Sequence, residues 1–159
     1  MTKEGRYIER AHYYRGYVLN QASMLEKAVE QVLLHELTGE DKPNEKIQHI
    51  IFDRMTYEAK RSSLGTVLQN KAISAGFVKT KKVGFPDKPL LDELESLNKI
   101  RNQFAHYHLF LADSDEYVIA LLNFRDHPTP IKYSELEVVD IISRMVAAED
   151  KVYKIIYPL

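Results

Sequence analysis

The stretch LLDELESLNKIRNQFAHYHLFL, residues 90 to 111, decides the predicted fold because it has the pattern of one amphipathic helix. Alternating steps of four and three residues mark a single stripe on the surface of a helix. That stripe is apolar except at two positions, and it consists of Leu90, Leu94, Leu97, Arg101, Phe104, His108 and Leu111. Because a buried guanidinium without a partner is costly, Arg101 must meet a carboxylate, line a wet cleft or face another subunit.

Angular spacing separates the polar residues of this helix into two groups. At about 100° per residue, Arg101 and His106 lie roughly 140° apart around the axis, whereas Asn102 and His106 lie one turn apart, side by side. Three arrangements would bring all of them together: an arginine side chain that reaches around the helix, a distorted helix end, or a second copy of the helix packed across a two-fold axis. The last arrangement would form a cleft lined by both chains.

Further helices are predicted before this one. Apolar residues recur at helical spacing over 7–37 and over 45–75, with a break near 53–56. Asp87 can cap the helix of the opening stretch, which we expect to run to about Leu111.

The pattern changes after that helix. Residues 117–133 are rich in β-branched and aromatic side chains around the turn sequence DHPTP, which predicts a small β-hairpin. Ser134 and Glu137 form the capping box S-x-x-E, which opens a last helix. We therefore expect a mainly α fold, an up-and-down bundle of four to five helices with a β-hairpin at about 117–133 inserted before the last helix. Residues 1–159 are expected to form one domain.

Composition limits the classes of function. The chain has 159 residues and a net charge of −1. Because it has no cysteine, it can form neither a disulfide framework nor a thiolate site. A near-neutral charge argues against a protein whose whole surface binds nucleic acid. No apolar run approaches the roughly 20 residues that cross a bilayer, and the N-terminus lacks an apolar signal core. We expect a soluble cytoplasmic protein with no membrane partner.

The segment IRNQFAH, residues 100 to 106, resembles the R-x(4 to 6)-H signature of the HEPN superfamily (higher eukaryotes and prokaryotes nucleotide-binding domain). A polar residue commonly follows the arginine in that signature, as Asn102 does here. Many HEPN proteins are metal-independent endoribonucleases of toxin–antitoxin, defence and RNA-processing systems, and they work as dimers whose two motifs face one cleft. The resemblance implies a single HEPN-like domain that cleaves RNA as a homodimer, needs no cofactor or metal, and can have an antitoxin or regulatory protein as partner.

Carried over to this chain, the resemblance implies a catalytic site of Arg101, Asn102 and His106. An imidazole can exchange protons near neutral pH, so His106 can take the proton of a ribose 2′-OH or return one to the leaving oxygen. Arg101 can stabilise charge on the phosphorane-like transition state, and Asn102 can orient His106 or hold phosphate. A cleavage of this kind leaves a 2′,3′-cyclic phosphate and does not act on DNA.

Two features depart from this pattern or offer an alternative. One HEPN subgroup has R-x4-H-x-Y, but here His108 occupies the tyrosine position and Tyr107 comes one residue early, so these two are accessory candidates only. The segments MTYEAKRSSLGTVL and LNKIRNQFAH are also similar to the mannitol-repressor family, which implies a non-catalytic regulatory module that binds protein, nucleotide or nucleic acid. That alternative predicts a buried ion pair for Arg101 and no phosphate-sized cleft around His106.

Other charged groups have weaker patterns. Five basic residues could track an RNA backbone or could simply be solvated, namely Lys60, Arg61, Lys79, Lys81 and Lys82. Glu26 and Glu30 lie one turn apart on the first helix and could neutralise Arg101. His106 and His108 would lie about 200° apart on a helix, which disfavours a shared metal ion, and we expect no metal site.

Overall fold

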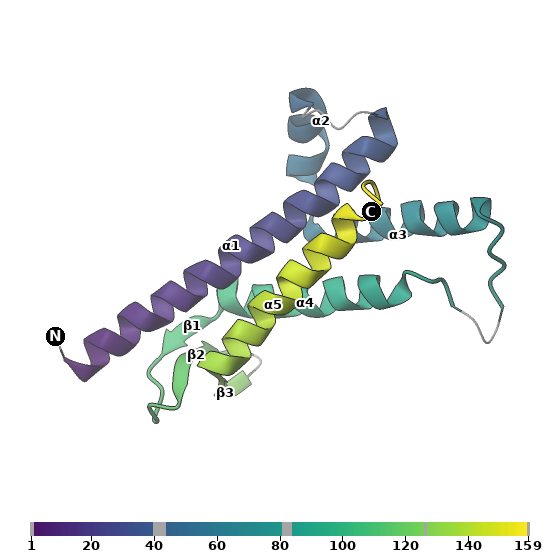
Figure 1. The fold of residues 1–159 in the computed structure, drawn as a ribbon. Helices are drawn as coiled ribbons and strands as arrows, with labels where there is room; N and C mark the ends of the chain where they lie inside the picture. Colours follow the sequence, from purple (N-terminus) through teal and green to yellow (C-terminus); the bar gives the residue numbers. More distant parts are fainter. Residues whose placement is uncertain (1, 40–43, 81–83, 126, 159) are drawn as a thin grey trace. The chain divides into compact units, whose positions relative to one another are not determined.

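The computed structural model of the chain describes residues 2–39, 44–80, 84–125 and 127–158. Within these ranges it is mainly helical, with a small three-stranded antiparallel sheet before the last helix (Figure 1). Its elements are α1 (Lys3–Thr38), α2 (Glu45–Ile50), the 3-10 helix η1 (Phe52–Arg54), α3 (Tyr57–Ser74), α4 (Lys88–His106), β1 (His108–Phe110), β2 (Tyr117–Asn123), β3 (His127–Ser134) and α5 (Glu135–Tyr153). The predicted mainly α fold class with a β-hairpin before the last helix is confirmed. None of the described helices combines the length and the apolar character needed to span a membrane.

The chain divides into two compact units. The sheet unit comprises Met1–Ser23 and Leu97–Val146, and the helical unit comprises Met24–Ser96 and Ala147–Leu159. Helices α1, α4 and α5 each contribute residues to both units. A single domain over residues 1–159 stays a prediction.

In the helical unit, side-chain caps explain why the predicted helix over 45–75 is broken. The side chain of Asn44 accepts a hydrogen bond from the Ile47 amide at 3.2 Å and begins α2. Thr56 accepts one from the Ala59 amide, also at 3.2 Å, and begins α3 after η1. Each cap satisfies an amide that has no partner within its helix. The break therefore falls near 53–56, as predicted.

A lysine is buried in the core of the helical unit, which corrects a prediction. Lys60 is only 4% exposed, and its ammonium lies 2.5 Å from Glu26 Oε1 and 2.6 Å from Glu30 Oε1. A buried ammonium with two carboxylates cannot reach an RNA backbone, so the prediction that Lys60 contacts RNA is wrong. The suggestion that Glu26 and Glu30 neutralise Arg101 is replaced by their pairing with Lys60.

The other basic candidates of this unit differ in their surroundings. Arg61 is largely engaged, since it makes an ion pair with Glu58 at 2.5 Å and donates to the Leu91 carbonyl at 3.3 Å. Lys79 is exposed, with its ammonium 5.5 Å from the centre of the Phe85 ring. The candidates Lys81 and Lys82 lie outside the described residues.

In the sheet unit, the strands follow the order β1-β2-β3 with antiparallel pairing throughout. The central strand β2 is buried along its whole middle section, residues 118–122. The predicted capping box begins α5: the Ser134 amide donates to Glu137 Oε2 at 2.7 Å, and the Glu137 amide donates to Ser134 Oγ at 3.3 Å. These reciprocal bonds stabilise the start of α5 directly after β3.

The prediction that the third main helix continues to about Leu111 is wrong, because α4 ends at His106. Residues 108–110 instead form β1, in which His108 pairs with Leu122 and Phe110 with Ala120. Without β1, one side of the buried strand β2 would have no hydrogen-bond partners for its backbone. The free-energy cost of those unpaired groups exceeds what three residues would gain by continuing the helix. His108 and Leu111 are therefore not on the helical stripe.

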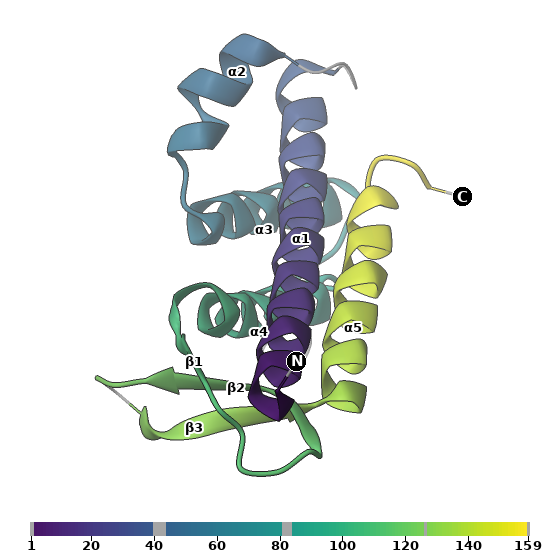
Figure 2. The same ribbon diagram turned by 90° about the vertical axis from the view of Figure 1, so that its left-hand side faces the viewer.

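The N-terminal half of α1 passes along the sheet and the start of α5 (Figure 2). Its Tyr7 hydroxyl donates to the Phe110 carbonyl at 3.0 Å, and its Tyr14 hydroxyl donates to Glu135. The fully buried apolar side chains of this unit come from α1, α4, β2 and α5, and they include Ala11, Val18, Phe104, Ile119, Leu121, Val138 and Met145. This packing fixes the end of α4, which carries the candidate site.

Candidate functional site

The last two turns of α4 place the three predicted catalytic residues. Arg101 and Asn102 are partly buried, and His106 is exposed at the C-terminal end of the helix. Phe104 lies between them in the chain and is fully buried, with its ring centre 5.2 Å from that of Tyr133. Phe104 therefore packs into the core, while Asn102 and His106 remain on a face that solvent can reach.

Arg101 makes a hydrogen bond to its neighbour Asn102, from Nη1 to Oδ1, at 3.0 Å. Its guanidinium therefore leans toward the side of the helix that carries Asn102, the residue one turn before His106. In the described part of the chain, no carboxylate pairs with Arg101.

A further arginine holds the end of α4. Arg15 of α1 donates from Nη2 to the Ala105 carbonyl at 3.0 Å, in the residue before His106. The last carbonyls of a helix have no partner within it and carry partial negative charge, so a guanidinium is favourable there. Arg15 is partly buried, and sequence reasoning missed it because nothing in the spacing of α1 distinguishes it from the exposed basic residues of that helix.

Tyr133 and Gln103 form a second polar contact beside the site. The Tyr133 hydroxyl donates to Gln103 Oε1 at 2.5 Å. Burial, followed by the charges of Glu137 and Tyr107, raises the pKa of Tyr133 to about 12. The phenol therefore stays protonated at neutral pH and serves as a hydrogen-bond donor. Sequence reasoning missed this pair as well, since Tyr133 lies thirty residues further along the chain, on β3.

The accessory candidates Tyr107 and His108 connect α4 to the sheet. Tyr107 is partly buried, and its amide donates to the Gln103 carbonyl at 3.0 Å, which closes the helix. His108 is exposed on β1, with its ring centre 5.3 Å from that of Phe124. Neither side chain makes a hydrogen bond to Arg101 or His106 within the described residues. Throughout the part of the chain that the structure describes, no three His, Cys, Asp or Glu residues are grouped to hold a metal ion.

These groups together supply an amide, a guanidinium and an exposed imidazole at one helix end. A guanidinium without a carboxylate partner retains its hydrogen-bond donors for an external anion, and its fork geometry matches a phosphate. The imidazole can exchange a proton with a hydroxyl at the same place. Comparison of the chain with protein-family models, with curated proteins and with solved structures found no match in any of the three.

Proposed function

We propose that the protein is a metal-independent endoribonuclease whose site is formed by Arg101, Asn102 and His106. The observation that carries the proposal is the contact between Arg101 and Asn102 at 3.0 Å. This contact directs the guanidinium of Arg101 toward the face of the helix that carries the exposed His106. Among the described residues, that guanidinium has no carboxylate partner. The alternative of a non-catalytic regulatory module predicts a buried ion pair at Arg101 and no phosphate-sized cleft around His106. The uncharged partner of Arg101 supports the ribonuclease on the first point. On the second point, the proposal takes the walls of the cleft from a second chain.

The reaction divides among the three side chains. His106 takes the proton of a ribose 2′-OH, which then attacks the neighbouring phosphorus, and a protonated imidazole returns a proton to the 5′ oxygen that leaves. Arg101 stabilises the extra negative charge on the phosphorane through charge-assisted hydrogen bonds. Asn102 aligns the guanidinium. The products are a strand ending in a 2′,3′-cyclic phosphate and a strand beginning with a free 5′-OH.

We propose further that two copies of the chain complete the cleft. In one chain His106 is exposed and lies roughly 140° around the helix from Arg101, so a phosphate held by both needs additional walls. A second α4 packed across a two-fold axis would supply them together with a second imidazole.

The test is incubation of purified protein with end-labelled single-stranded RNA in EDTA. Wild-type protein is expected to cleave it and to leave an all-deoxy strand of the same sequence intact. His106→Ala should lower the rate at least about 100-fold, the range expected for loss of a general acid–base group. His108→Ala is the matched control, since it removes another exposed histidine two residues away and should leave the rate within about threefold of wild type.

Mixing two inactive variants tests the shared cleft. If the cleft takes its arginine from one chain and its histidine from the other, Arg101→Ala mixed with His106→Ala should recover a measurable part of the activity. RNA that stays intact with concentrated wild-type protein, while circular dichroism shows the folded state, would contradict the ribonuclease proposal altogether.

A further inference from the structure

The first turns of α1 carry an exposed stripe of two arginines followed by two tyrosines. Arg6, Arg10, Tyr13 and Tyr17 follow one another at steps of four, three and four, which places them within an arc of roughly 60° on the helix. All four are exposed, with Tyr13 at 66% and Tyr17 at 46%. We call these residues the Arg–Tyr stripe, and all of them belong to the sheet unit.

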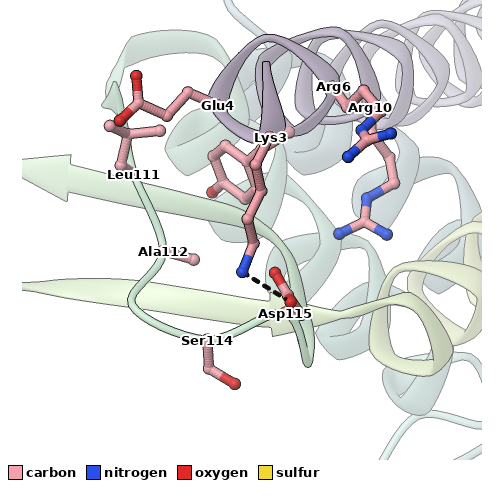
Figure 3. A pocket seen from close by; sticks show the side chains of 9 residues that line it. Lys3, Glu4, Arg6, Arg10, Leu111, Ala112, Ser114 and Asp115 are labelled. Atoms are coloured by element: carbon pink, nitrogen blue, oxygen red, sulfur yellow. Dashed lines mark ion pairs between the residues drawn. The ribbon is translucent and has the colours of Figure 1, made fainter. Parts of the chain in front are cut away.

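A hollow of about 770 Å³ adjoins the arginine end of the stripe, between the start of α1 and the loop that follows β1 (Figure 3). Its charged lining consists of Lys3, Arg6, Arg10, Glu4 and Asp115. Lys3 and Asp115 neutralise each other in an ion pair of 2.8 Å. The carboxylate of Glu4 and the guanidiniums of Arg6 and Arg10 remain, a net charge of +1, and the two guanidiniums lie together, away from Glu4 (Figure 3).

Neither guanidinium has a carboxylate partner among the described residues. Arg10 donates to the Tyr117 carbonyl at 3.4 Å, a weak contact that leaves most of its donors available. The neighbouring carboxylate of Glu9 is exposed and makes no ion pair with either arginine in the described chain. Two like charges one turn apart repel each other slightly, so an anion bound between them would be favoured.

The tyrosine end of the stripe has a different chemistry. The rings of Tyr13 and Tyr17 have centres 6.3 Å apart at an angle of 37°, and the ring of Tyr13 also meets that of Tyr14 edge to face at 5.4 Å. Tyr13 is mostly open to solvent and Tyr17 about half so. Exposed aromatic rings that continue a row of cations are the usual means of holding a single strand, because phosphates bind the cations and bases stack on the rings. Duplexes keep their bases stacked internally and would gain nothing from these rings.

We propose that the Arg–Tyr stripe binds single-stranded RNA, with Arg6 and Arg10 on neighbouring phosphates and Tyr13 and Tyr17 stacked against bases. The choice of RNA as the ligand rests on the proposed ribonuclease function. The stripe itself is separate from the catalytic groups, so binding and cleavage can fail independently of each other.

The experiment measures binding of a fluorescent 12-nucleotide single-stranded RNA to the full chain carrying His106→Ala, in EDTA, by anisotropy over a range of salt concentrations. Adding Arg6→Gln and Arg10→Gln should weaken binding. It should also make the fall of log affinity with log salt shallower, by about 1.4 in slope, or about 0.7 for each lost phosphate contact. Adding Tyr13→Leu and Tyr17→Leu should weaken binding at least about 30-fold, at about 1 kcal/mol or more for each lost stacking contact, with the salt slope unchanged. The matched control, Lys46→Gln with Arg54→Gln, removes two exposed cations of the helical unit and should change neither quantity.

Three results would contradict RNA binding by the Arg–Tyr stripe. These are no binding of RNA, equal losses of affinity in the stripe and control variants, or tighter binding of a duplex than of the single strand. Stripe-dependent binding by a protein that never cleaves RNA would support the stripe and refute the proposed function. If the variant without Arg6 and Arg10 still cleaves RNA and binds it with normal affinity, RNA binding by the stripe is refuted and the proposed function is not.

Discussion

Lys60 in the helical unit and Arg101 in the sheet unit are two cations withdrawn from solvent, and their partners differ. Lys60 is almost fully buried and its charge is matched by Glu26 and Glu30, both within 2.6 Å. Arg101 is only partly buried, and its contact is the neutral amide of Asn102. A cation that the fold neutralises serves the fold, whereas a cation held in place with its charge unmatched is available to a ligand.

The largest effect on stability is expected from Lys60→Met. Removing the ammonium leaves Glu30 buried with a weaker set of partners, since Lys27 and Gln48 remain at 2.7 and 3.2 Å. Breaking a buried ion pair by deleting one partner costs about 3 kcal/mol at the low end of the usual range. Urea unfolding followed by circular dichroism measures the loss.

A control in the same unit sharpens this prediction. Lys71→Met removes an ion pair with Glu36 in which the lysine side chain is 43% exposed, so the loss should stay below about 1 kcal/mol. Equal losses from the two lysine variants would show that Lys60 is not specially stabilised. Adding Glu30→Gln to Lys60→Met should restore part of the stability, because it removes the buried charge that was left unpaired.

The same network predicts a pH dependence of stability. Burial alone would raise the pKa of Glu30, but hydrogen bonds from Lys27 and Lys60 outweigh it and hold that pKa below its usual value of 4.5. Burial alone would lower the pKa of Lys60, but Glu26 and Glu30 raise it above 10.5.

The contribution of Glu30 to the free energy of unfolding is thus complete above pH 4.5. It is lost as the pH falls through the lowered pKa that Glu30 has in the folded protein. The Lys60 contribution is complete below pH 10.5 and is lost as the pH rises through its raised folded pKa. Urea midpoints measured from pH 3 to 11 should form a plateau for wild type, with smaller losses at both ends for Lys60→Met. An unchanged profile in the variant would count against the network.

The smallest effect is expected at the helix caps, where the two units should behave alike. Ser134 caps α5 in the sheet unit, and Thr56 caps α3 in the helical unit. Ser134→Ala and Thr56→Ala should each lower the free energy of unfolding by about 1 kcal/mol. A loss above about 3 kcal/mol at either position, read from the urea midpoint, would show that the side chain does more than cap its helix.

Features that depend on neighbouring residues were predictable from the sequence. The capping box at Ser134 and Glu137 and the break before Thr56 follow from residue types that satisfy amides a few positions away. The end of α4 did not follow, because HLF at 108–110 is compatible with a helix and becomes a strand only through its pairing with residues 120–122 of β2. Tertiary pairing outweighed local propensity there.

The candidate site divides in the same way. The motif of Arg101, Asn102 and His106 could be found from the sequence, and so could its angular spacing on a helix. The partners of each charge could not, since they come from distant elements. Lys60 looked like one half of a basic surface pair with Arg61, and only the fold brings it to Glu26 and Glu30. Arg15, which binds the Ala105 carbonyl, gave no signal in the sequence.

We propose that Arg101 binds a ligand and contributes little to the stability of the fold, and replacing it with alanine separates these two roles. Arg101→Ala and wild type are compared for their initial rate of single-stranded RNA cleavage in EDTA, at concentrations corrected to equal folded protein. We expect a rate about 100- to 1000-fold lower in the variant, as for loss of a transition-state hydrogen-bond donor, with stability within about 1 kcal/mol of wild type. A variant that cleaves at the wild-type rate, or one that unfolds as readily as Lys60→Met, would contradict it.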